Sequence, residues 1–174
     1  MGDWLLLKKL SYPIRLGKIC MKVGTFGGIG VYIHWTFWLL IAIYLISVTA
    51  TSGLGAGLLA VAFVMCVFGC VVLHEFGHAG AAAAFGIPTA DITLLPIGGV
   101  ARLTRLPDKP YQELIVALAG PAVNVVIAGL LLPLVWFGVE LGGSAPAVGA
   151  GMDFLTQLLA ANIVLVVFNM LPAF

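Results

Sequence analysis

The residues with the clearest chemical use are two histidines and a glutamate in the stretch His74-Glu75-Phe76-Gly77-His78. Residues four apart lie on one face of a helix, so two imidazoles at this spacing can bind the same zinc ion. Glu75, next to the first histidine, can serve as general base toward a metal-bound water. The spacing therefore predicts a hydrolytic centre with one Zn²⁺ per chain, His74 and His78 as metal ligands and Glu75 as the catalytic residue.

A catalytic zinc ion normally has three protein ligands, and the sequence offers no convincing third one. Cys70 continues the helical stripe of the histidines, but the helix rises about 12 Å from position 70 to position 78. Zinc bonds of about 2.0 to 2.3 Å cannot bridge that span, so we interpret Cys66 and Cys70 as packing residues. Asp91 and Asp108 remain alternatives, although each is expected in a solvated loop. Asp153 is expected at the far side of the membrane.

Two asparagines, Asn124 and Asn169, are expected at the same depth as the histidines. Each could donate a hydrogen bond to a developing oxyanion. Each could equally form a hydrogen bond between helices. His34, Trp35 and Trp38 are typical of the aromatic belt at a membrane interface rather than of a site.

The elements that position these residues must lie in a membrane. The chain has 174 residues, of which 62% are hydrophobic and 9% charged, whereas a soluble domain carries about 25% charged residues. Most of the surface is therefore expected to meet lipid. A net charge of +1 argues against nucleic acid as a partner, and three cysteines argue against a disulfide scaffold.

Hydropathy predicts an all-α polytopic membrane protein, folded as a single transmembrane core over residues 1–174. A spanning helix needs about 20 apolar residues, and four such stretches are predicted near 31–48, 54–85, 114–139 and 154–171. Residues 1–30 form a cytoplasmic or interfacial segment. The mixed segment between the second and third spans predicts a short membrane-associated β-hairpin or a re-entrant loop, and Gly120-Pro121 predicts a kink in the third span.

The basic residues predict the orientation. Five of the eight lysines and arginines precede the first span, and the other three lie between the second and third. The positive-inside rule therefore places the N-terminus, the 86–110 segment and the opening of the active site in the cytoplasm. The loop near 141–151, rich in glycine, serine and proline, is expected on the outside.

Taken in order, four motifs resemble the site-2 protease family of intramembrane zinc metalloproteases, in particular its compact prokaryotic branch. They are His74-Glu75-Phe76-Gly77-His78, Leu95-Pro96-Ile97-Gly98-Gly99-Val100, the Ala-Gly-Pro-x-x-Asn run that ends at Asn124, and Asn169-Met170-Leu171-Pro172-Ala173-Phe174. Ile33-His34-Trp35-Thr36 also looks like the start of the family's first span. The resemblance covers nearly the whole chain.

The resemblance implies an intramembrane zinc metalloendopeptidase in a prokaryotic cell membrane, which cleaves transmembrane protein substrates in regulated intramembrane proteolysis. It also implies that an aspartate just beyond Phe174 supplies the third zinc ligand, so the sequence is expected to be a truncated core. Gly98 and Gly99 could belong to a strand edge that holds an unwound substrate by strand addition. They could instead form a turn without substrate contact.

Two other functions compete with this one. A membrane transporter or metal-handling channel could use His74, Glu75 and His78 as an ion site, although no internal repeat typical of transporters is present. A catalytically inactive relative could bind membrane segments without cutting them, although the intact Glu75 argues against this. The sequence indicates neither a particular substrate nor an oligomeric state.

Overall fold

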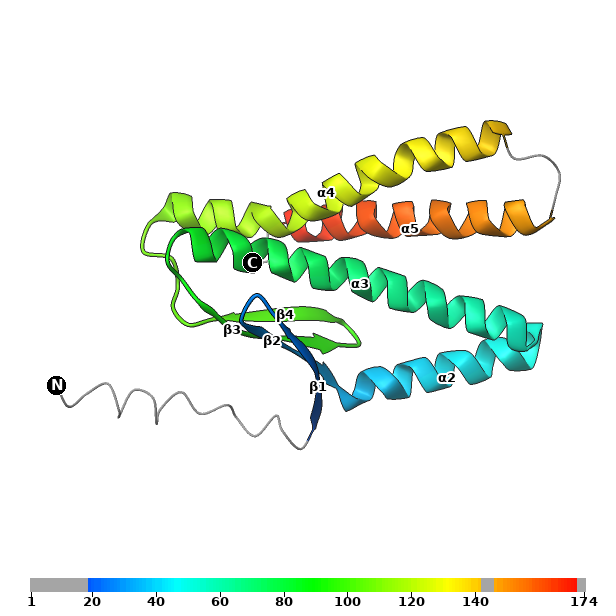
Figure 1. Ribbon diagram of the computed structural model, residues 1–174, viewed down its shortest axis with the longest axis horizontal. Helices are drawn as coiled ribbons and strands as arrows, with labels where there is room; N and C mark the ends of the chain where they lie inside the picture. Colours follow the sequence, from blue (N-terminus) through cyan, green and yellow to red (C-terminus); the bar gives the residue numbers. More distant parts are fainter. Residues whose placement is uncertain (1–18, 142–145, 172–174) are drawn as a thin grey trace.

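The computed structural model describes residues 19–141 and 146–171, which form a small sheet and a layer of long helices (Figure 1). In chain order the elements are β1 (Cys20–Phe26), β2 (Ile29–His34), α2 (Trp35–Ser52), α3 (Leu54–Ala84), β3 (Thr89–Leu95), β4 (Gly98–Leu103), α4 (Pro110–Leu141) and α5 (Pro146–Met170). Helix α3 lies in the middle, with α4 and α5 on one side and α2 and the sheet on the other.

All four helices are long and apolar enough to cross a membrane, which confirms the four predicted spans. The predicted break between the first two spans shrinks to one residue, Gly53, between α2 and α3. Gly53 has φ +85°, a left-handed conformation that glycine adopts without a steric penalty. The two helices therefore meet in a very tight turn.

The first span begins later than predicted, because residues 29–34 form strand β2 rather than helix. Val31 and Ile33 are buried and the residues between and beside them are less so, the two-residue period of a strand. The side chain of His34 caps α2: its Nδ1 accepts a hydrogen bond from the Thr36 amide at 3.3 Å. His34 is thus a helix cap as well as a neighbour of the exposed Trp35.

The sheet has four strands in the order β1-β2-β3-β4, which is twice the size of the predicted hairpin. The predicted hairpin corresponds to the antiparallel pair β3 and β4. In the additional pair, β1 comes from the predicted N-terminal segment and β2 mostly from the start of the predicted first span. The pair joins the hairpin through a parallel β2–β3 pairing in which Ile33 opposes Leu94. Residues 1–18 of that segment lie outside the described residues.

The sheet is held against the helices by a core of buried apolar side chains contributed by β2, β3, α2 and α3: Ile33, Phe37, Val71 and Leu94. On the opposite side of α3, Gly77 allows α4 to come very close, since a Cβ on Gly77 would lie 2.6 Å from the carbonyl oxygen of Ala119. The C-terminal half of α3 therefore lies between the sheet and α4.

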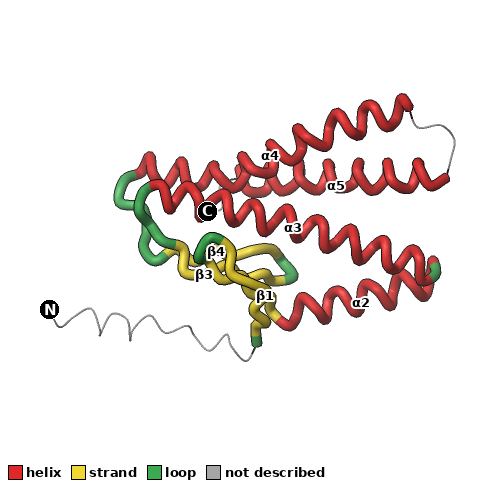
Figure 2. Tube along the Cα trace, in the orientation of Figure 1, coloured by secondary structure: helices red, strands yellow, loops and turns green. Residues whose placement is uncertain are grey.

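The last two helices differ from their predicted limits. Helix α4 continues through Pro121 and Pro133, and Figure 2 shows that it changes direction along its length, as expected where prolines remove backbone hydrogen bonds. Helix α5 begins at Pro146, eight residues before the predicted start at 154. Proline is well tolerated in the first turn of a helix. The predicted outer loop is thus shorter, and its residues 142–145 lie outside the described residues.

Candidate metal centre

The two histidines of α3 meet at the face that packs on α4. Their Nε2 atoms are 3.0 Å apart, and His74 is only 4% exposed. His74 lies ten residues before Ala84, where α3 ends, so the pair is roughly 15 Å along the helix from that end. The spacing of the sequence motif therefore produces the expected convergence of two imidazoles.

Helix α4 fixes both imidazole rings from the far side. Nδ1 of His78 donates to the carbonyl oxygen of Val116 at 2.7 Å. Nδ1 of His74 donates to Oδ1 of Asn124, also at 2.7 Å. Because the proton of each neutral ring is then on Nδ1, both Nε2 atoms present a lone pair. At a separation of 3.0 Å the two Nε2 atoms can share a proton or can both bind one metal ion.

The separation of these atoms suits a zinc ion. Two nitrogens bound to one tetrahedral zinc at about 2.0 to 2.1 Å lie roughly 3.3 Å apart, close to the separation of the two Nε2 atoms. Gly120 of α4 faces them: a Cβ there would lie 2.7 Å from Nε2 of His74 and closer still to Nε2 of His78. A glycine at this position keeps free the region in which both lone pairs converge.

Glu75, the next residue after His74 and therefore about 100° around α3 from it, is held by strand β4. Its side chain is buried, and Oε2 accepts a hydrogen bond from the backbone N–H of Ala101 at 3.0 Å. Gly99 lies so near that a Cβ there would be 2.6 Å from Cγ of Glu75 and 2.9 Å from Oε1. Gly98 has φ +140° and belongs to the β3–β4 turn. Of the two candidate glycines, Gly99 thus contacts Glu75, while Gly98 shapes the turn.

Among residues 19–141 and 146–171, no third histidine, cysteine, aspartate or glutamate joins the histidine pair. The expected aspartate beyond Phe174 falls outside the described residues. Asp108 is exposed and accepts a hydrogen bond from Arg105 at 2.6 Å, as expected for a loop. No other ligand is therefore found within the part of the chain that the structure describes.

Asp91 is not in a solvated loop, contrary to the expectation. It lies on β3, directly opposite Arg102 of β4 in the strand register. The guanidinium group of Arg102 bonds both of its oxygens, with Nε 2.8 Å from Oδ1. These hydrogen bonds raise the pKa of Arg102. Asp91 is committed to an ion pair of the sheet and is not a free metal ligand.

The two candidate asparagines have different surroundings. Asn124 is fully buried, and its amide nitrogen donates to Oδ1 of Asn162 at 3.0 Å while its oxygen faces His74. The oxyanion role considered for Asn124 is therefore replaced by a role in orienting a histidine. Asn169 is exposed and donates to the carbonyl oxygen of Leu165 in its own helix at 2.7 Å. The structure gives it no contact with the histidine pair.

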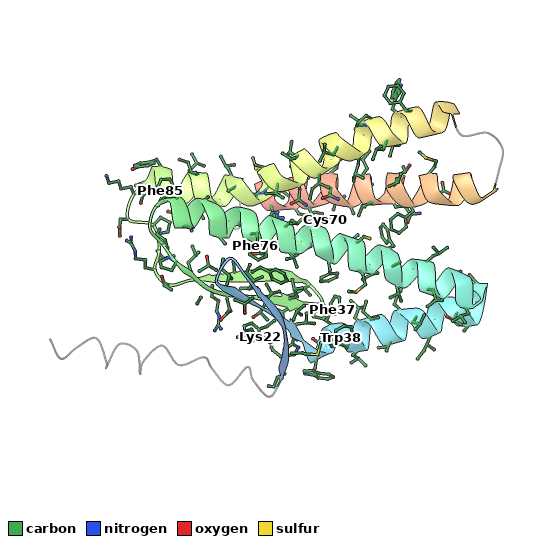
Figure 3. All side chains as sticks on the ribbon, in the orientation of Figure 1. Lys22, Phe37, Trp38, Cys70, Phe76 and Phe85 are labelled. Atoms are coloured by element: carbon green, nitrogen blue, oxygen red, sulfur yellow. The ribbon has the colours of Figure 1, made fainter. Side chains whose placement is uncertain are left out.

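Asn162 is a residue that the sequence analysis missed. It is fully buried in α5, and its amide nitrogen donates to the Leu158 carbonyl oxygen at 2.9 Å and to Cys70 Sγ at 3.5 Å. Figure 3 shows the labelled Cys70 on α3 at the side facing α4 and α5. The available signal was an asparagine in an apolar helix, since polar groups at membrane depth are rare without a partner. Cys70 is buried there, and Cys66 is exposed.

Known proteins share this arrangement. The model of peptidase family M50 matches residues 62–142. A zinc metalloprotease of Methanocaldococcus jannaschii is 34% identical over 167 residues, which are 95% of this chain and 43% of that protein. The solved site-2 protease from the same organism superimposes with a TM-score of 0.66 and 29% identity, over 89% of this chain and 66% of that one. Residues 62–142 belong to peptidase family M50, and nearly the whole chain is similar to a site-2 protease.

The M50 match runs from within α3 through the end of α4, so it contains the histidine pair, Glu75, the β3–β4 hairpin and Gly120. A putative zinc metalloprotease of Synechocystis is 31% identical over 159 residues, which are 87% of this chain and 40% of that protein. The chain thus spans less than half the length of both curated relatives. The chain has the helices of a membrane protein, an M50 segment over residues 62–142 and a histidine pair suited to zinc.

Proposed function

We propose that this protein is an intramembrane zinc metalloendopeptidase, which hydrolyses peptide bonds of transmembrane protein substrates. The observation that carries the proposal is the convergence of the two Nε2 atoms of His74 and His78, 3.0 Å apart, within a helix long and apolar enough to cross a membrane. Relatives named as zinc metalloproteases support the choice of metal. One zinc per chain is expected, with a third ligand from an aspartate after Phe174.

Glu75 and the two histidines have separate roles in the proposed hydrolysis. When bound, zinc supplies a Lewis acid that polarises a carbonyl oxygen and acidifies water. Glu75 accepts the proton of the attacking water, and geometry favours Oε1 for this, because Oε2 already accepts the N–H of Ala101. The same carboxyl group can then deliver the proton to the leaving amine. His74 and His78 hold the metal and take no part in proton transfer.

The substrate is expected to bind along strand β4. A transmembrane substrate is helical, so its carbonyl groups are hydrogen-bonded and must be freed before water can attack. Strand β4 forms the edge of the sheet and packs on α3 beside Glu75. A substrate segment added to this edge would be extended and would lie next to the catalytic carboxyl group. This arrangement supports the proposed cleavage of unwound membrane segments, and regulated intramembrane proteolysis is the process in which we propose that it takes part.

The test is the Glu75→Gln variant of the full-length protein, reconstituted in liposomes with a single-span substrate. The amide keeps the size of the side chain but cannot accept the proton, so cleavage should fall by about 10²- to 10⁴-fold. Zinc content should stay at the wild-type level. Glu113→Gln provides the matched control, because Glu113 is an exposed carboxyl group in the first turn of α4, and it should cleave normally.

Other results would redirect the proposal. Near-normal cleavage by Glu75→Gln would rule out this carboxyl group as the base. A zinc-loaded wild type that retains substrates without cutting them would favour the inactive relative. Zinc flux into sealed vesicles in the absence of cleavage would favour the transporter.

A further inference from the structure

A chain of buried hydrogen bonds runs from helix α5 to the histidine pair. Asn162 of α5 contacts Asn124 of α4, and Asn124 contacts His74 of α3. Both asparagines are fully buried. A buried polar group in a membrane-crossing helix is costly and is seldom retained without a function. The peptidase chemistry described above makes no use of Asn162.

The donor and acceptor roles in this series of hydrogen bonds are set at its end farthest from His74. The backbone carbonyl oxygen of Leu158 can only accept, so the part of the Asn162 side chain that faces it, 2.9 Å away, must be the amide nitrogen. The oxygen of Asn162 then faces Asn124 and can only accept from it. The amide nitrogen of Asn124 is thereby committed to Asn162. Its oxygen is left facing His74, which fixes the orientation of both side-chain amides.

The same argument assigns the ring proton of His74. Because the oxygen of Asn124 accepts, Nδ1 of His74 must carry the ring proton. Nε2 of a neutral ring is then unprotonated, and this is the atom that faces His78. If the amide of Asn124 turned over, its nitrogen would face Nδ1 instead. That arrangement favours the other tautomer, with a proton on Nε2, which cannot bind a metal.

We propose that Asn162 is a positioning residue that, through Asn124, fixes the tautomer of His74 so that Nε2 is free to bind zinc. The inference rests on the proposed role of His74 as a zinc ligand. It assigns to α5, which carries neither histidine, a part in preparing the metal centre before metal arrives. Removing such an outer partner of a metal-binding histidine typically weakens metal binding by about 10- to 100-fold.

The first test reads the tautomer directly. Full-length metal-free protein labelled with ¹⁵N-histidine in detergent micelles gives long-range ¹⁵N–¹H correlations that distinguish a protonated Nδ1 from a protonated Nε2. We expect His74 to carry its proton on Nδ1, with its signals assigned by their loss in His74→Gln. A proton on Nε2 in the wild type would overturn the inference without any further variant.

The second test removes the amide group of Asn162. Asn162→Leu keeps the approximate volume but lets the amide of Asn124 turn, so both tautomers of His74 should appear and zinc affinity, measured by chelator competition, should fall by about tenfold or more. Cys70→Ala is the matched control. It removes only the weaker acceptor of Asn162 and leaves the Leu158 carbonyl in place, so the tautomer and the affinity should stay within about twofold of the wild type.

The third test restores an acceptor facing Nδ1 of His74 in the absence of the Asn162 side chain. Both oxygens of a carboxylate accept, so Asn124→Asp cannot present a donor to His74. Added to Asn162→Leu, it should return the Nδ1–H tautomer and most of the zinc affinity. Should Asn162→Leu fail to fold, Asn162→Ser replaces it, since a serine hydroxyl can bond the Leu158 carbonyl of its own helix but is too short to reach Asn124.

The outcomes separate this inference from the proposed function. Unchanged tautomer and affinity in both Asn162 variants, an equal loss in Cys70→Ala, or no recovery with Asn124→Asp would each overturn the role of Asn162. A wild type that shows the Nδ1–H tautomer but takes up no zinc would instead overturn the proposed metalloprotease.

Discussion

The proposed metal centre depends on one residue that contributes no functional group. Gly120 faces the point at which the lone pairs of His74 and His78 converge. Any side chain there would occupy the region that a shared metal ion needs. The glycine is therefore a requirement of the chemistry and not of the backbone, since helix α4 continues through this position.

The Gly120→Ala variant should lose its metal. A Cβ at this position would lie 2.7 Å from Nε2 of His74 and closer to Nε2 of His78, so the imidazoles would have to turn away from each other. We expect zinc content, measured by elemental analysis of purified protein, to fall by about tenfold or more. The protein should remain folded, because alanine is the better helix former.

Gly129→Ala is the control for this prediction. Gly129 lies in the same helix, and a Cβ there would meet nothing within 4 Å. Its zinc content should equal that of the wild type. Full zinc loading of Gly120→Ala would contradict the assignment of the metal to these two histidines.

Sequence reasoning found the residues whose chemistry is local and missed those whose role depends on tertiary contacts. The spacing of His74 and His78 fixes their common face on any helix, so the pair could be predicted. The role of Asn124 could not, because it depends on a partner 38 residues away in α5. Asp91 was misjudged for the same reason, since the strand register that places it opposite Arg102 is not a local pattern.

At the scale of elements, strand β4 and helix α3 jointly set the position of the Glu75 carboxyl group, which we propose as the general base. Ala101 holds one oxygen of Glu75, and Gly99 leaves just enough room for its side chain. The sheet was only half predicted, because an uncharged apolar run such as 31–48 satisfies the criteria of a spanning helix. Hydropathy does not distinguish the strand β2 at its start from the helix α2 that follows.

The Gly99→Ala variant should separate cleavage from metal binding. The added Cβ would lie 2.6 Å from Cγ of Glu75, so the carboxyl group must shift. A displacement of about 1 Å at a catalytic group can cost about 10²-fold in rate. We expect that loss in the liposome cleavage assay, with wild-type zinc content, because the histidines contact α4 and not β4.

Gly69→Ala is the comparison for Gly99→Ala. Gly69 lies in α3, and a Cβ there would meet nothing within 4 Å, so both cleavage and zinc content should be retained. Loss of zinc in Gly99→Ala would show that β4 supports the whole centre instead of the carboxyl group alone.

At the scale of the whole molecule, the lengths of the helices lead us to expect the sheet near one membrane surface. Helix α3 has 31 residues and α2 has 18, or about 46 and 27 Å, against a bilayer core of about 30 Å. The sheet packs beside the part of α3 that α2 does not cover (Figure 1). The basic residues Arg102, Arg105 and Lys109 fall in or just after this sheet.

We predict that this end of the molecule faces the cytoplasm, since short segments rich in lysine and arginine stay on that side. Single cysteines are introduced by Arg105→Cys, Ile97→Cys and Ser144→Cys into full-length protein with its natural cysteines replaced. With a membrane-impermeant thiol reagent, position 144 should react in intact bacterial cells, whereas positions 97 and 105 should react only after permeabilisation. Arg105 is exposed and pairs only with Asp108 of its own loop among the described residues, so burial inside the protein cannot explain protection of position 105.

The labelling result also bears on catalysis. The end of α3 that faces Arg105 is roughly 15 Å of helix from His74, and this is the shorter route from bulk water to the histidines, because the other end at Leu54 is 20 residues away. Labelling of positions 97 and 105 in intact cells, with position 144 protected, would reverse the topology. Water for hydrolysis would then have to enter from the outside, and the prediction of cytoplasmic access to the histidines would be wrong.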